Sequence, residues 1–264
     1  MKNRFYGKYY KFISDEKYVL ACIISHANEG DMLQIITKEN SYLIKDTESI
    51  KINNDIITFN VNTEELKING QIKLGKLNPL KSKVMGPFTY LPMECRHEIY
   101  SMYHTLNGKL TINDKEYNYN DSLGYIEGDS GKNFPTKYIW YNSVLKDTTV
   151  TLAIATIPLF GFINFKGLLC FIKTKNKEYK ICTYNFGKIK KINNNEIIIK
   201  KAKYIFSLNF DLKDGNNLKA PIKGNMDRYI KETITISTKY KLTYKNNIIL
   251  DSSDDISSLE FMWD

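Results

Sequence analysis

The sequence has few of the residues that build metal centres and disulfide frameworks. Its 264 residues include four cysteines and three histidines. These residues are Cys22, Cys95, Cys170, Cys182, His26, His97 and His104. No two cysteines have the CxxC spacing of a zinc or redox motif, and the histidines are not paired. We therefore expect no metal site, and we expect the cysteines, which lie in apolar runs, to be buried free thiols.

Arginine is also scarce. Arg4, Arg96 and Arg228 are the only arginines among 38 basic residues, so the net charge of +9 comes mainly from lysines scattered along the chain. Nucleic-acid sites usually combine clustered positive charge with arginine, whose guanidinium makes paired hydrogen bonds. Scattered lysines are more typical of a solvated surface. The composition therefore predicts no nucleic-acid partner.

No apolar run is uninterrupted enough for a membrane-spanning helix. The most apolar stretch, residues 152–172, contains Pro158, Gly161 and Lys166. A spanning helix needs about 20 mostly apolar residues, so two strands joined by a turn fit this stretch better. The first residues are basic and lack the apolar segment of a signal peptide. We expect no integral membrane segment and a cytoplasmic location.

What the sequence does contain is a repeated β pattern, rich in aromatic residues, with 19 tyrosines and 13 phenylalanines. Short alternating segments are separated by pairs of turn-forming residues. These pairs are Asn53-Asn54, Asn69-Gly70, Asn107-Gly108, Asn113-Asp114, Asp214-Gly215 and Asn246-Asn247. The spacing predicts an all-β barrel or sandwich. Residues 94–104 could form a helix, but we predict a strand, and the chain length suggests two domains, residues 1–144 and 145–264.

Residues 123–142 interrupt this repetition with side chains suited to chemistry. Glu127 and Asp129 are two residues apart, so in a strand they share a face at a separation of about 6–7 Å. Tyr125 lies on the same face. Two carboxylates this close are difficult to ionise together, which keeps a proton available for acid catalysis.

The same stretch also supplies aromatic side chains. Tyr138 and Trp140 share a face on what we expect to be the returning strand of a hairpin. Such a hairpin would present the two acids opposite aromatic rings, which stabilise a carbocation.

Several motifs in the middle of the chain resemble those of the tocopherol cyclase-like family. The matching residues are Pro87-Phe88, Met93-Glu94-Cys95-Arg96-His97, Leu106–Ile112, Gly124-Tyr125-Ile126-Glu127, Phe134-Pro135 and Tyr138-Ile139-Trp140. Gly128 and Ser130 stand where plant-type members have Lys and Trp. The composition, rich in Lys, Asn and Ile, is typical of a low-GC bacterium. The sequence therefore resembles a bacterial branch of the family.

This resemblance implies two lipocalin-like antiparallel β-barrels or half-barrels packed together, with an apolar cavity. It also implies a hydrophobic small-molecule partner, an isoprenoid or a lipid, and no cofactor. Tocopherol cyclases add a phenol oxygen across a prenyl double bond, and the acid that protonates the alkene would here be Glu127 or Asp129. The expected ligand-binding residues are Glu94, Arg96, His97, Tyr125, Tyr138, Trp140, Asn142 and Arg228.

Other interpretations stay open. Arg96 or Arg228 could pair with the two carboxylates in a purely structural network. His97 could be an ordinary core histidine, and Cys95, two residues before it on one strand, is badly placed for a Cys–His dyad. The protein would then be a non-catalytic lipid-binding module, or a structural or interaction protein whose interior is filled by side chains.

Overall fold

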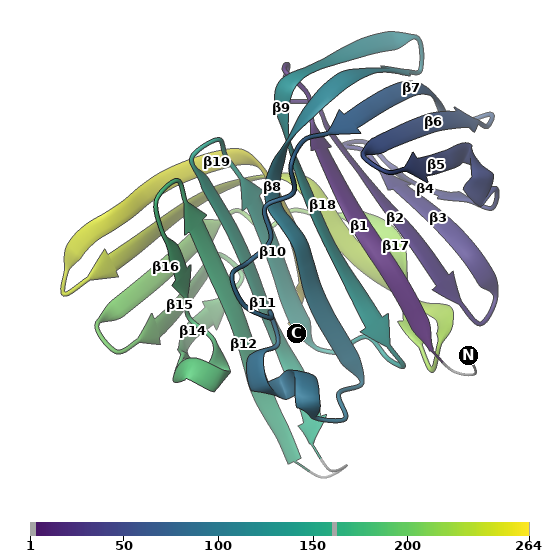
Figure 1. Ribbon diagram of the computed structural model, residues 1–264. Helices are drawn as coiled ribbons and strands as arrows, with labels where there is room; N and C mark the ends of the chain where they lie inside the picture. Colours follow the sequence, from purple (N-terminus) through teal and green to yellow (C-terminus); the bar gives the residue numbers. More distant parts are fainter. Residues whose placement is uncertain (1–3, 160–162, 264) are drawn as a thin grey trace. The chain divides into compact units, whose positions relative to one another are not determined.

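A computed structural model describes residues 4–159 and 163–263, and most of them lie in β-strands (Figure 1). The described part contains strands β1 to β19 and three short 3-10 turns. The strands form two large antiparallel sheets. The all-β prediction is therefore confirmed.

The first sheet has nine strands in the order β4-β3-β2-β1-β9-β8-β7-β6-β5. It consists of two meanders that meet where β1 pairs with β9. The strands are β1 Phe5–Ile13, β2 Val19–Ala27, β3 Gly30–Ile36, β4 Ser41–Ile44, β5 Ile50–Asn53, β6 Ile56–Asn62, β7 Lys67–Leu74, β8 Cys95–Ile112 and β9 Lys115–Gly131.

The second sheet repeats this plan in the order β13-β12-β11-β10-β19-β18-β16-β15-β14, with β17 paired to β18 as an addition. Its two meanders meet where β10 pairs with β19. The strands are β10 Tyr138–Val144, β11 Thr148–Leu159, β12 Ile163–Thr174, β13 Glu178–Lys180, β14 Lys188–Asn193, β15 Glu196–Lys201, β16 Tyr204–Phe210, β17 Asn216–Ile222, β18 Asn225–Tyr244 and β19 Asn247–Met262.

The chain divides into two compact units, each built from several segments. Unit 1 comprises Met1–Lys83, Glu94–Asn133 and Leu218–Arg228. Unit 2 comprises Val84–Met93, Phe134–Asn217 and Tyr229–Asp264. The division expected between residues 144 and 145 stays a prediction about which parts of the chain fold on their own.

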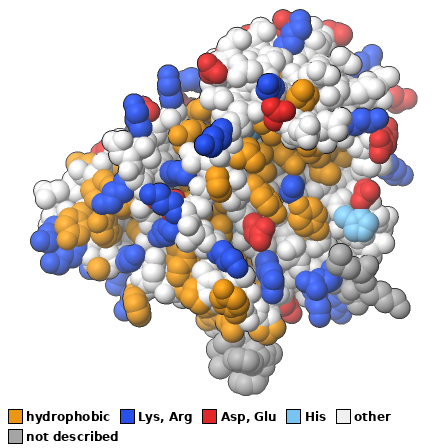
Figure 2. All heavy atoms as spheres, in the orientation of Figure 1, with side chains coloured by type: hydrophobic (Ala, Val, Ile, Leu, Met, Phe, Trp, Pro, Cys, Tyr) orange, Lys and Arg blue, Asp and Glu red, His pale blue; other side chains and the backbone are white. Residues whose placement is uncertain are grey.

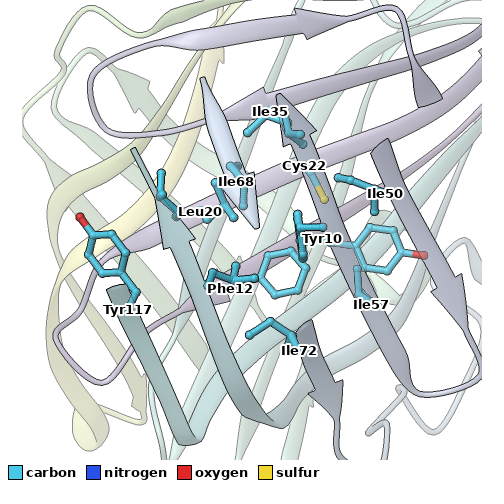
Figure 3. Packing of buried hydrophobic residues seen from close by; sticks show 14 of the residues in the cluster. Tyr10, Phe12, Leu20, Cys22, Ile35, Ile50, Ile57, Ile68, Ile72 and Tyr117 are labelled. Atoms are coloured by element: carbon cyan, nitrogen blue, oxygen red, sulfur yellow. The ribbon is translucent and has the colours of Figure 1, made fainter. Parts of the chain in front are cut away.

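One face of the first sheet carries the apolar core of unit 1, and alternation along the strands decides which residues lie there (Figure 3). Tyr10 and Phe12 of β1 and Ile126 of β9 belong to this core. A 3-10 turn, η1 (Thr47–Ser49), joins the edge strands β4 and β5 and contacts β3 and β6. The sheet therefore curves around its core, and the neighbouring residues of β1 and β9 point to the opposite face. We call this opposite face the outer face.

The second sheet is arranged in the same way within unit 2. Ile139 and Tyr141 of β10 and Leu259 of β19 belong to its apolar core. Their strand neighbours, among them Trp140 and Glu260, therefore lie on the outer face of this sheet.

Two of the expected turns are wrong, and the structure gives the reason. Asn69-Gly70 lies inside β7 and Asn107-Gly108 lies inside β8. Gly70 and Gly108 both have φ of 138°, and a Cβ on either would lie 2.2 Å from a backbone oxygen of the paired strand. These glycines permit close contact between two strands instead of forming turns. The turn at Asn113-Asp114, which joins β8 to β9, is confirmed, as is the strand at residues 94–104, where β8 begins.

The hairpin expected over residues 123–142 is also wrong. Both edges of β9 are occupied, by β1 and by β8, whereas β10 pairs with β11 and β19. The segment between Gly131 and Tyr138 therefore connects two different sheets. Phe134-Pro135 lies in this connection.

The apolar stretch at residues 152–172 forms parts of β11 and β12, as predicted, and Phe160, Gly161 and Phe162 between them lie outside the described residues. Within the described part of the chain, no helix is both long enough and apolar enough to span a membrane.

Candidate functional site

The outer face of the first sheet carries the polar side chains expected for a site. Tyr125, Glu127 and Asp129 of β9 share this face, because Ile126 between them points into the apolar core. Gly128 keeps the strand close to its neighbours, since a Cβ there would lie 2.6 Å from the carbonyl oxygen of Gly7 on β1. The predicted common face of the two carboxylates and Tyr125 agrees with the geometry.

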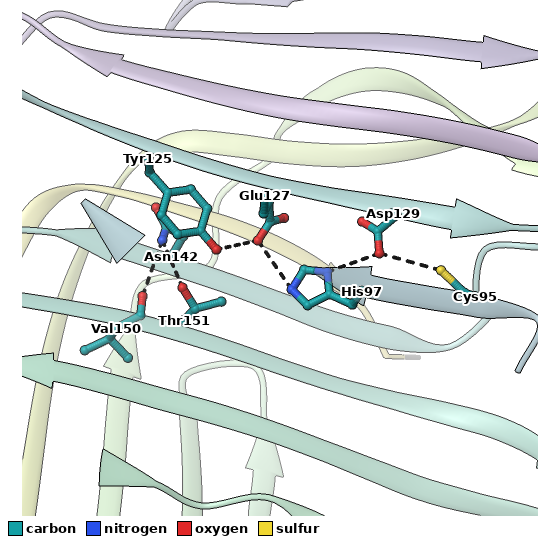
Figure 4. Close-up of polar contacts among 8 residues, drawn as sticks. All are labelled: Cys95, His97, Tyr125, Glu127, Asp129, Asn142, Val150 and Thr151. Atoms are coloured by element: carbon teal, nitrogen blue, oxygen red, sulfur yellow. Dashed lines mark hydrogen bonds and ion pairs between the residues drawn. The ribbon is translucent and has the colours of Figure 1, made fainter. Parts of the chain in front are cut away.

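His97 of β8 lies between the two carboxylates (Figure 4). Its Nε2 is 3.5 Å from Oε2 of Glu127, and its Nδ1 is 3.1 Å from Oδ1 of Asp129. The hydroxyl of Tyr125 donates to Oε2 of Glu127 at 2.5 Å, and the thiol of Cys95 donates to Oδ1 of Asp129 at 3.6 Å. These five residues form one continuous chain of proton-carrying groups, which we call the His97 cluster.

The His97 cluster is largely shielded from solvent. The side chains of His97 and Glu127 are 11% and 6% exposed, and that of Asp129 is 21% exposed. A protonated His97 would donate to one carboxylate from each ring nitrogen. The arrangement is suited to holding a proton and passing it between His97 and Glu127.

Cys95 is a hydrogen-bond donor in this cluster. Burial, together with the charge of Asp129 and the hydrogen bond to it, raises the pKa of the Cys95 thiol well above its usual range. The thiol therefore stays protonated at neutral pH, and it lacks the thiolate that nucleophilic catalysis requires.

The cluster also offers ligand types that bind metals. His97, Glu127 and Asp129 can each present one ligand atom within 4.8 Å of the others. The imidazole ring, however, lies between the carboxylates and directs a different nitrogen at each. One ion binds only one nitrogen of a histidine ring, so this orientation suits proton transfer better than chelation.

Arg96, Glu94 and Arg228 are the remaining predicted residues of unit 1. Arg96 alternates with Cys95 and His97, and its exposed side chain projects from the other face of β8. Glu94 is exposed and holds the end of β9, because Asn133 donates to its carboxylate at 3.2 Å. Arg228 is half-buried in β18. Both carboxylates pair with His97.

Tyr138, Trp140 and Asn142 lie on β10 in unit 2, buried to 4%, 6% and 0% exposure. The hydroxyl of Tyr138 donates to Glu260. The amide nitrogen of Asn142 is 3.2 Å from Oγ1 of Thr151 and 3.5 Å from the carbonyl oxygen of Val150 (Figure 4). β10 is thus not the partner strand of β9 that the sequence suggested.

Sequence reasoning missed a buried lysine next to the His97 cluster. Lys11 of β1 is 1% exposed and is the register partner of Tyr125, and its neighbour Tyr9 is the register partner of Glu127. Lys11 therefore lies on the same outer face, in a diagonal position relative to Glu127 on the neighbouring strand. The signal was a single charged residue within the apolar run of residues 9–13.

Lysine and arginine side chains are spread among acidic and apolar ones on the face of the molecule that Figure 2 shows. This agrees with the scattered lysines of the sequence. The absence of a nucleic-acid partner stays a prediction.

The fold has relatives among solved structures, although the sequence matches no protein-family model and no curated protein. Kievitone hydratase from Nectria haematococca aligns over 99% of this chain and 90% of its own, with a TM-score of 0.58 and 8% identity. CghA, solved with Sch210972, aligns over 98% of this chain and 87% of its own, with a TM-score of 0.62 and 7% identity. This chain shares the fold of these two proteins, a lipocalin-like β fold with two large antiparallel sheets.

Proposed function

We propose that this protein binds an apolar small molecule of the isoprenoid or lipid type and adds an oxygen nucleophile to one of its double bonds by acid catalysis. The observation that carries the proposal is His97 held between Glu127 and Asp129, with Tyr125 bound to Glu127. The family resemblance of the central motifs and the fold shared with a hydratase support it.

Glu127 is the acid in this proposal. It is the less exposed carboxylate, and a carboxyl group shielded from water retains its proton more readily than an exposed one. Asp129 is a positioning residue, because it binds Nδ1 of His97 and so directs Nε2 towards Glu127. The reactive form has a neutral His97 and a protonated Glu127.

The reaction balances without a cofactor. Glu127 gives its proton to one carbon of the double bond, and the other carbon becomes a tertiary cation. An oxygen bearing a proton then attacks the cation and forms a C–O bond, and its proton returns to the Glu127 carboxylate. If the oxygen belongs to the ligand, the product is a ring and the reaction is an isomerisation. If the oxygen comes from water, the reaction is a hydration.

Native mass spectrometry of the purified protein, followed by turnover of any co-purifying lipid in D₂O, tests the proposal. Acid catalysis places one deuterium on a carbon of the product. We expect Glu127→Gln to lose about 10²–10⁴-fold in rate and Asp129→Asn to lose less. Glu98→Gln is the matched control, because Glu98 is exposed and projects from the other face of β8. Unchanged turnover in both cluster variants would refute the acid assignment, and a ligand that the wild type binds but never converts would indicate a non-catalytic binding protein.

A further inference from the structure

The positive charge of this chain is concentrated in one part of unit 2. Residues 163–210, which form β12 to β16, contain eleven lysines, two glutamates and no aspartate or arginine. Their net charge is therefore +9, as large as that of the whole chain, and the remaining residues are neutral overall. Within this segment Lys188 of β14 and Lys200 of β15 are exposed register partners. Like charges directly opposite each other destabilise a sheet, so this positive surface is kept at a cost in stability.

Exposed apolar side chains lie at the tip of the β18–β19 hairpin. Tyr244, Ile248 and Ile249 are 36%, 61% and 37% exposed, and Lys245 stands in the turn that joins the two strands. The turn between β15 and β16 lies beside this tip, because the backbone nitrogen of Lys245 donates to the carbonyl oxygen of Lys203 at 3.1 Å. Figure 2 shows apolar side chains among basic ones at the end of unit 2 where this hairpin turns in Figure 1. The two turns therefore combine an exposed apolar surface with positive charge.

Three tyrosine rings form a row of contacts that ends at this tip. The ring centroid of Tyr204 on β16 lies 4.7 Å from that of Tyr244 and 6.0 Å from that of Tyr179 on β13. A lysine lies over each end of the row, with Nζ of Lys245 5.7 Å from the Tyr244 ring and Nζ of Lys177 4.9 Å from the Tyr179 ring. Tyrosine is enriched where a protein meets the interface of a bilayer, because its ring is apolar and its hydroxyl is polar.

We propose that this end of unit 2 docks on the surface of an anionic phospholipid bilayer. Ile248 and Ile249 enter the boundary between headgroups and acyl chains, and the surrounding lysines attract the anionic headgroups. A nucleic acid fits less well, because residues 163–210 contain no arginine and a nucleic acid offers no apolar layer to the two isoleucines. Docking does not involve Glu127. Under the proposed function, it places the protein beside the membrane in which an apolar ligand is dissolved.

Co-sedimentation with lipid vesicles tests the proposal. We expect the wild type to bind vesicles of phosphatidylglycerol and phosphatidylcholine in equal parts, and to bind pure phosphatidylcholine vesicles at least about tenfold more weakly. Lys200→Gln combined with Lys203→Gln should weaken binding to the anionic vesicles about 25-fold, since each lysine near the surface contributes about fivefold. This variant should be no less stable than the wild type in urea, because it relieves the repulsion between Lys188 and Lys200. Ile248→Ser combined with Ile249→Ser should weaken binding about tenfold or more.

The matched controls remove the same kinds of side chain from unit 1. They are Lys51→Gln combined with Lys67→Gln, and Ile52→Ser, where Ile52 is 41% exposed. These variants and Glu127→Gln should bind the vesicles as the wild type does, so docking and the proposed catalysis can fail separately. Equal binding to both kinds of vesicle, unchanged binding in either tip variant, or an equal loss in the controls would overturn the proposal. Lysine-dependent binding of a single-stranded DNA oligonucleotide that is tighter than binding of the vesicles would also overturn it, in favour of a nucleic-acid surface.

Discussion

His104 should make the protein unstable in mild acid. It is 2% exposed in β8, and its Nδ1 is 3.1 Å from Oγ of Ser101. Ser101 donates its own hydrogen to the carbonyl oxygen of Tyr103 at 2.9 Å. Nδ1 of His104 must therefore carry the hydrogen and donate it to Ser101, which leaves Nε2 without a proton. Nε2 faces Gly124, where a Cβ would lie 2.6 Å away.

The size of the effect follows from the pKa. Burial lowers the pKa of His104 from 6.5 to about 4. The unfolded chain therefore takes up a proton below pH 6.5, whereas the folded protein does so only near pH 4. The contribution of neutral His104 to the free energy of unfolding is therefore fully present above pH 6.5 and is lost as the pH falls towards 4. At about 1.4 kcal/mol per pH unit, the loss is about 3 kcal/mol.

Urea denaturation followed by far-UV circular dichroism at pH 7 and pH 4 measures this loss. The wild type is compared with His104→Gln, whose amide does not titrate in this range. The contributions of all other titratable groups to the pH dependence are common to both proteins and cancel in this comparison. We expect the wild type to lose about 3 kcal/mol more than the variant between the two pH values. His26→Gln is the control, because His26 is exposed and pairs with Asp31, and it should follow the wild type. Equal losses in wild type and His104→Gln would refute the reasoning.

Two glycines give further predictions. Gly124→Ala should destabilise the protein by about 1–3 kcal/mol, since the new methyl group meets His104. In a double-mutant cycle measured by urea denaturation, adding His104→Ala should restore part of the lost stability. Gly70→Ala should cost at least about 2 kcal/mol, because its Cβ meets a backbone oxygen that cannot move aside. Gly30→Ala is the control, since Gly30 also has a positive φ, of 104°, but an added Cβ there has no atom within 4 Å. A loss of stability in Gly30→Ala as large as that in Gly70→Ala would contradict the steric explanation.

Alternation along single strands could be predicted well from the sequence. The common face of Tyr125, Glu127 and Asp129 follows from a spacing of two and needs no knowledge of neighbouring strands. The choice of partner strand could not be predicted in this way. Trp140 seemed to lie opposite the acids because it is near them in sequence, yet β10 pairs with β11 and β19. Strand pairing depends on contacts between residues far apart in the chain, which a local pattern does not encode.

Asn-Gly pairs show a similar ambiguity. A glycine with positive φ forms a tight turn in one context and permits close approach of two backbones in another. Gly70 and Gly108 are of the second kind, and each lies within a long strand. Their flanking residues alternate as they would next to a hairpin turn. Only the paired strand distinguishes the two cases.

The position of His97 shows why the site itself was only partly predictable. Counting back from the confirmed turn, Ile112 pairs with Lys115, and an uninterrupted ladder would place His97 opposite Ser130. The β8–β9 ladder instead contains three register irregularities, and His97 faces Asp129. A shift of one residue turns a side chain to the other face of a strand, so the uninterrupted ladder would have separated His97 from both carboxylates. The register irregularities between residues 99 and 107 therefore place His97 opposite Asp129, and removing one should separate the histidine from the acids without changing any residue of the cluster.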